Sequence, residues 1–130
     1  MKETIIVLFA AIIIHGMEAL HDYAVIQCQS KDYELVKKWN RMWHIVSAWT
    51  FFAFYLTLSI LQNNYWFLPL GASVRGMIFW PLLNQMLGRP IYDTSNHFPE
   101  KYFYGRGKLL FAIYLITYLI SFFFSCQTYN

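Results

Sequence analysis

Four long apolar segments separated by polar connections form the main pattern of this chain. They cover approximately residues 4–26, 42–61, 65–87 and 109–126. A bilayer core about 30 Å thick needs roughly 20 helical residues to cross it, and each segment is close to that length. The pattern predicts an all-α fold: a polytopic membrane helical bundle, a single domain over residues 1–130, with about four transmembrane helices.

The first segment carries an unusual polar cluster. The apolar run Ile5–Ile14 is too short to span a bilayer, so the helix has to continue through the polar residues that follow. At about 100° per residue, His15, Glu18, His21 and Asp22 fall within one third of the helix circumference. Ionisable groups at membrane depth are costly unless they face partners or water. We therefore expect the polar residues of this face to have a functional role. A cleaved signal peptide is the alternative for this segment, although no small-x-small cleavage site precedes Glu18.

The remaining segments differ in regularity. Segment 42–61 has no charged residue and begins among tryptophans, which favour membrane interfaces. In segment 65–87, Pro69 and Gly71 interrupt the start and Pro81 is expected to kink the helix, so we predict that the third helix is broken. A half-embedded helix is the alternative there. The polar linker 27–40 is expected to hold a short surface helix, and the Gly- and Pro-rich connection 88–107 a loop on the membrane interface.

Composition supports the membrane class. The chain is 58% hydrophobic and 21% aromatic, and only 13% of its residues are charged, whereas about a quarter are charged in soluble domains. No basic run accompanies the net charge of +3, which argues against a nucleic-acid partner. Cys28 and Cys126 match no metal-binding or redox spacing. The partners we expect are membrane lipid and a homo-oligomer or larger membrane complex.

The distribution of basic residues predicts the orientation. Lysines and arginines gather in or beside the first and third connections, while the N-terminus, the turn at 62–64 and the C-terminal tail together hold only Lys2. The positive-inside rule then places both long connections in the cytoplasm and both termini outside the inner (cytoplasmic) membrane. The basic residues concerned are Lys31, Lys37, Lys38, Arg41, Arg89, Lys101, Arg106 and Lys108.

This topology brings the scattered polar residues toward the cytoplasmic face. Several histidines and carboxylates around one cavity would suit a divalent metal ion (Zn, Mn or Fe). We expect the metal ligands among Glu18, His21, His44 and His97, with His15 as a further candidate. The leading hypothesis is a metal-dependent enzyme, a hydrolase acting on a lipid or other amphiphile at the cytoplasmic face. Asp22 or Asp93 would act as general base, and Arg75 or Asn84 would stabilise the developing anion.

Two further hypotheses stay open. The polar residues can simply bond to one another, for example His44 with Asp22 or Arg75 with Glu18, in a non-enzymatic membrane protein. Such a protein would be holin-like, pore-forming or a subunit of a membrane complex. A b-type haem protein is the third hypothesis, in which His15 or His21 would pair with His44 as axial ligands.

A resemblance appears at the third segment. The stretch from Arg75 to Tyr92, with Trp43-His44 and His21-Asp22, resembles uncharacterised small polytopic membrane proteins of bacteria and their phages. The resemblance carries no established activity. It implies that a recurring unit combines Arg75, Asn84, Gly88 and Tyr92 with His44.

Overall fold

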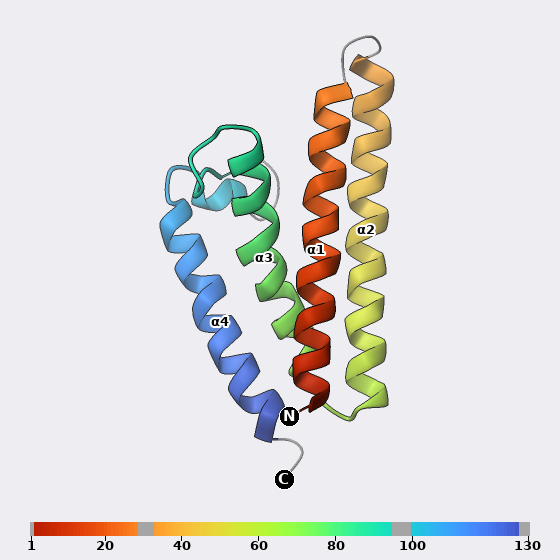
Figure 1. Cartoon of the computed structure of the whole chain (residues 1–130), viewed down its shortest axis with the longest axis vertical. Coiled ribbons are helices and arrows are strands. Elements are labelled where there is room, and N and C mark those ends of the chain that lie inside the picture. Colours follow the sequence, from red (N-terminus) through yellow and green to blue (C-terminus); the bar gives the residue numbers. More distant parts are fainter. Residues whose placement is uncertain (1, 29–32, 95–99, 128–130) are drawn as a thin grey trace.

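The chain forms four long helices that run alternately up and down (Figure 1). This computed structural model describes residues 2–28, 33–94 and 100–127. The elements are α1 (Lys2–Cys28), α2 (Tyr33–Leu61), α3 (Phe67–Met86), the short 3-10 helix η1 (Glu100–Phe103) and α4 (Gly107–Gln127). One end of the bundle holds the start of α1, the end of α4 and the turn between α2 and α3, and the opposite end holds the end of α1, the start of α2, the end of α3 and the start of α4.

Helix α3 is the central element, because it packs against α1, α4 and α2. Two glycines allow the close approach of its neighbours. A side chain at Gly71 would overlap the ring of Tyr55 from α2, and one at Gly76 would overlap the ring of Tyr114 from α4. Aromatic rings of the flanking helices therefore lie directly on the backbone of α3.

Two expected boundaries differ from the structure. The surface helix expected within 27–40 is not separate, since α2 continues without interruption from Tyr33 to Leu61. No proline or glycine occurs in that stretch to end the helix. The predicted break in the third helix is also not confirmed, because α3 is a single helix with Pro81 inside it. Pro69 falls in its first turn, where a proline costs no intrahelical hydrogen bond.

A six-residue motif, residues 84–89, ends α3. Gly88 has a φ of 67°, in the left-handed region that favours glycine. The amide of Arg89 donates to the carbonyl of Asn84, and that of Gly88 donates to the carbonyl of Gln85. These two bonds form the Schellman pattern that satisfies the last carbonyls of a helix.

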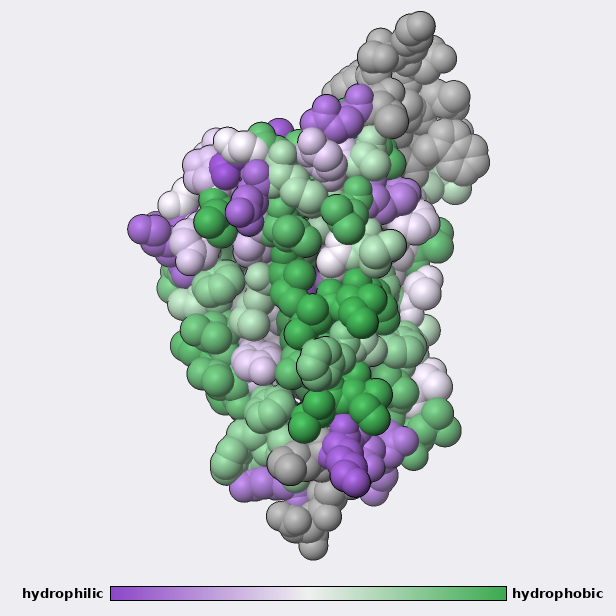
Figure 2. Space-filling view, in the orientation of Figure 1, coloured by the Kyte–Doolittle hydropathy of each residue, from purple (hydrophilic) through white to green (hydrophobic). Residues whose placement is uncertain are grey.

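The surface is apolar around the middle of the bundle and polar at both ends. Figure 2 shows this on one face, where green covers the centre and purple gathers at the two ends. Three helices of the described residues are long and apolar enough to cross a membrane: Lys2–Gln27, Met42–Leu61 and Gly107–Gln127. The chain therefore has the architecture of a helical membrane bundle.

Candidate functional site

The polar residues of α1 lie along a buried stripe that faces the rest of the bundle. Buried positions recur at helical spacing from one end of the helix to the other, which is the pattern of one helix face. The stripe consists of Thr4, Val7, Ala11, His15, Glu18, Ala19 and Asp22. His21, which the sequence placed on the same face, lies at its edge with its side chain 43% exposed. The predicted polar face is thus confirmed for three of its four residues.

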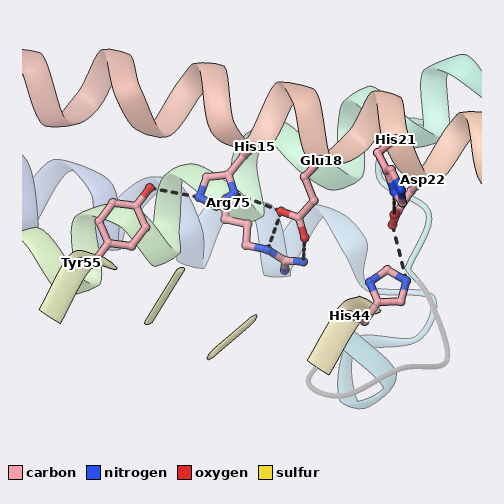
Figure 3. Close-up of polar contacts among 7 residues, drawn as sticks. All are labelled: His15, Glu18, His21, Asp22, His44, Tyr55 and Arg75. Carbon is pink, nitrogen blue, oxygen red and sulfur yellow. Dashed lines mark hydrogen bonds and ion pairs between the residues drawn. The ribbon is translucent and has the colours of Figure 1, made fainter. Parts of the chain in front are cut away.

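Glu18 is the most fully paired charged group of this stripe (Figure 3). Its side chain is only 1% exposed, and Arg75 of α3 contacts both of its carboxylate oxygens. Arg75 Nη2 donates to Oε1 at 2.7 Å, and Nε donates to Oε2 at 3.1 Å. This two-bond geometry is the strong, directional form of an arginine–carboxylate pair. The guanidinium also lies over the ring of Phe79, 4.7 Å from its centroid.

His15 extends this network to α2. Its Nδ1 lies 3.1 Å from Glu18 Oε2, and its Nε2 lies 3.2 Å from the hydroxyl of Tyr55. Because an ionised carboxylate only accepts, Nδ1 donates to Glu18, and Nε2 forms the second hydrogen bond with the Tyr55 hydroxyl. Phe51 packs edge-on against the imidazole at a centroid distance of 4.8 Å. Both ring nitrogens of His15 are therefore engaged within the protein.

A second polar group lies one helical turn beyond Glu18 (Figure 3). Asp22 is buried, with Oδ1 3.4 Å from His21 Nδ1 and Oδ2 3.5 Å from His44 Nε2. The two imidazoles are far more accessible, with side chains 43% and 37% exposed. The His21 ring stacks on Trp43 at 4.3 Å. We call His21, Asp22 and His44 the Asp22 cluster. This cluster joins the C-terminal part of α1 to α2.

The other predicted site residues lie elsewhere or outside the described residues. The Asn84 side chain donates to the backbone carbonyls of Ile91 at 3.2 Å and Asp93 at 2.8 Å, so it fastens the loop after α3. Asp93 is exposed on that loop. His97 lies outside the residues that the structure describes.

A metal ion needs several donor side chains grouped around one point. Among residues 2–28, 33–94 and 100–127, no three histidine, cysteine or acidic side chains are grouped in a way that could hold a metal ion. Glu18 and His15 are directed into the network with Arg75 and Tyr55. The donors in this part of the chain thus do not fit a metal centre as they are placed.

Sequence reasoning missed several residues that hold the network. Tyr55 was one of ten tyrosines, and no local pattern distinguished it from those facing lipid. At the opposite end of the bundle, Thr4 and Asn64 both donate to the carbonyl of Ser125, at 3.3 and 2.9 Å. The Asn64 side chain also accepts from the amide of Trp66 at the start of α3. The signal for Asn64 was its place directly after the helix end in the 62–64 turn.

The fold and the site together define a class: a small helical membrane bundle with an interhelical ion pair in its interior. No protein-family model, curated protein or solved structure matches this chain.

Proposed function

We propose that this chain is a non-enzymatic integral membrane protein with four spanning helices, acting as a subunit of a membrane assembly. One observation carries the proposal: Glu18 and Arg75, the central carboxylate and cation of the polar face, neutralise each other through two hydrogen bonds. Arg75 and His15 together occupy three of the roughly four acceptor sites of this carboxylate, and its side chain is only 1% exposed, so it is closed to a ligand or substrate from solution. The polar face then serves to fix α1, α2 and α3 against one another.

The length of α3 supports a fourth span beside the three helices that are long and apolar enough to cross a membrane. At 1.5 Å per residue, a helix as long as α3 measures about 30 Å, the thickness of the hydrocarbon core. Arg75, the charged residue of α3, is paired with Glu18 inside the bundle. This pairing lowers the free-energy cost of placing the Arg75 charge at membrane depth. Basic residues lie in or beside the connections that follow α1 and α3. They support a cytoplasmic location for that end of the bundle, with both termini outside.

A subunit is favoured over a pore formed by one copy. The polar residues in the C-terminal half of α1 run from Asp22 to His15, which contacts Tyr55 of α2. Beyond it, the interior is a buried apolar cluster of side chains, formed by Val7, Ala11, Tyr55, Phe67, Leu70 and Val74. A close-packed apolar interior leaves no path for ions.

The metal-dependent hydrolase is the second candidate, and the Asp22 cluster is the observation that favours it. Two accessible imidazoles lie beside one buried carboxylate, and these are residue types that bind metals, but the three side chains as placed are not grouped so as to hold an ion. Asp93 and His97 would have to join the cluster from the third connection.

Metal retention separates the two candidates. We would express the protein in metal-replete medium, purify it without chelators, and measure bound metal by elemental analysis for the parent, His44→Ala and His44→Gln. A subunit should retain far less than one ion per chain, with no difference among the three proteins. Retention of one Zn, Mn or Fe ion per chain by the parent, lost in His44→Ala, would overturn the non-enzymatic proposal.

A further inference from the structure

A cavity of about 340 Å³ lies where α4 meets the loop after α3. Its wall combines loop residues with the first turn of α4: Pro90, Ile91, Tyr92, Asp93, Thr94, Gly105, Arg106, Gly107 and Lys108. A smaller hollow of about 20 Å³ adjoins it and shares the wall residues Ile91 to Thr94 and Gly107. That hollow runs between α3 and α4 over Trp80, Leu110, Phe111 and Tyr114. The cavity and the hollow, together called the cleft, share these walls, and most of the lining of both is apolar.

The shape of this cleft is fixed by several independent contacts. Asn84 holds the loop through the carbonyls of Ile91 and Asp93. The Tyr92 carbonyl lies so close to Gly107 that a side chain there would overlap it. The Tyr92 ring packs edge-on against Phe111 of α4, at a centroid distance of 5.2 Å. The cavity is therefore a built feature of the loop rather than a gap between loosely packed segments.

The mouth of the cavity carries an excess of positive charge. Arg106 and Lys108 are exposed, and neither forms an ion pair with a residue in the described part of the chain. Asp93 is the one acidic residue on the wall, which leaves a net charge of +1. Both cations flank the first residue of α4, one of the helices able to cross a membrane, so in the proposed orientation they lie at the level of the cytoplasmic headgroups. Anionic lipids are attracted to basic residues at that level.

We propose that this cleft binds an anionic phospholipid in its larger cavity, with the phosphate between Arg106 and Lys108 and the start of the acyl chains against Ile91 and Tyr92. The charge selects an acidic headgroup, and the mostly apolar lining of the cavity favours a lipid over a free phosphate. This inference rests on the membrane location of the proposed function, but not on whether the chain is a subunit or an enzyme.

The test compares lipid binding by the purified full chain in a neutral detergent, measured by native mass spectrometry. Phosphatidylglycerol and phosphatidylcholine are the two probes. The parent should retain one phosphatidylglycerol and no phosphatidylcholine. In the variant Arg106→Gln/Lys108→Gln, the affinity for phosphatidylglycerol should fall by roughly 25-fold, because each basic residue near the headgroup contributes about a factor of five.

Arg89→Gln is the matched control, since Arg89 is an exposed cation next to Pro90 that does not line the cavity. It should bind phosphatidylglycerol as the parent does. An equal loss in Arg89→Gln would show general electrostatic attraction and overturn the proposal, as would undiminished binding by the double variant or equal binding of phosphatidylcholine. Inorganic phosphate supplies the last arm. Displacement of the lipid by equimolar phosphate would assign the site to the free anion and overturn the lipid assignment.

Discussion

Arg75 and Glu18 stabilise the fold as a pair, because each neutralises the charge of the other. Moving a single ion out of water costs several kcal/mol, and a partner offsets that cost only with good geometry. Here both carboxylate oxygens are bonded, and His15 provides a third contact. The Arg75 side chain, 29% exposed, remains partly accessible while Glu18 does not. The loss of either partner should therefore be far more damaging than the loss of both.

A double-mutant cycle tests this pairing. Glu18→Gln leaves the Arg75 cation without its counter-charge, and we expect it to lower the free energy of unfolding by about 3 kcal/mol. Arg75→Gln should be similarly destabilising. The double variant Glu18→Gln/Arg75→Gln should regain most of the loss, because no uncompensated charge remains. Unfolding in mixed micelles by titration with sodium dodecyl sulfate provides the measurement. Additive losses would contradict the pairing, and Arg89→Gln, an exposed cation, serves as the control that should change nothing.

At the scale of elements, the bundle is organised by small residues on α3. Gly71 and Gly76 present different faces, and each accommodates a tyrosine ring from a different neighbouring helix. Small residues allow such close approach between membrane helices, where burial of apolar surface does not drive association. The Tyr55 ring reaches His15 only because Gly71 leaves room for it. Packing on α3 thus positions one end of the polar network on α1.

The substitution Gly71→Ala measures this effect. Its methyl group would overlap the Tyr55 ring, so the ring has to move and the Tyr55–His15 hydrogen bond is lost. We expect a loss of about 2 kcal/mol in the free energy of unfolding, typical of overpacking. Gly16→Ala on α1 is the matched control, because nothing lies within 4 Å of the added methyl group. It should leave stability unchanged or raise it by up to about 1 kcal/mol through helix propensity. Equal losses in both variants would refute the role of the close contact.

At the scale of the whole molecule, polar contacts occur in two layers. The first layer, made of the Asp22 cluster and the neighbouring Glu18–Arg75–His15 network, extends from the C-terminal part of α1 to the middle of that helix. The second layer consists of the bonds of Thr4 and Asn64 to Ser125, at the end that holds the start of α1 and the end of α4 (Figure 1). Apolar packing separates the two layers. The surface in Figure 2 is apolar in the middle and polar at both ends, which matches the profile of a bilayer.

The orientation can be checked with the two cysteines. Cys28 ends α1 and Cys126 lies near the end of α4, at opposite ends of the bundle (Figure 1). In spheroplasts of a bacterial host, a membrane-impermeant maleimide should label Cys126, and label Cys28 only after lysis. The variants Cys28→Ser and Cys126→Ser assign each signal. Labelling of Cys28 in intact spheroplasts, with Cys126 protected, would mean the inverted orientation.

The sequence by itself determined the helical class, the approximate extent of α1, α3 and α4, the end of α2 and the buried face of α1. These features follow from one-dimensional signals: the length of apolar runs and the 3.6-residue period that places His15, Glu18 and Asp22 on one side. The sequence also offered the Arg75–Glu18 and His44–Asp22 pairs as alternatives to a metal site, and the structure contains both.

Only the tertiary structure decided which partner each polar group takes. The choice of Arg75 for Glu18 and of Tyr55 for His15 depends on the depth and rotation of each helix relative to α1. Those two quantities are set by packing, such as the rings that lie on Gly71 and Gly76, and have no periodic signature along the chain. Asn84 makes the same point, because its spacing gave no sign that it holds the loop at Asp93 rather than a substrate. Periodicity identifies the face of a helix, whereas contact between faces requires all the helices to be placed together.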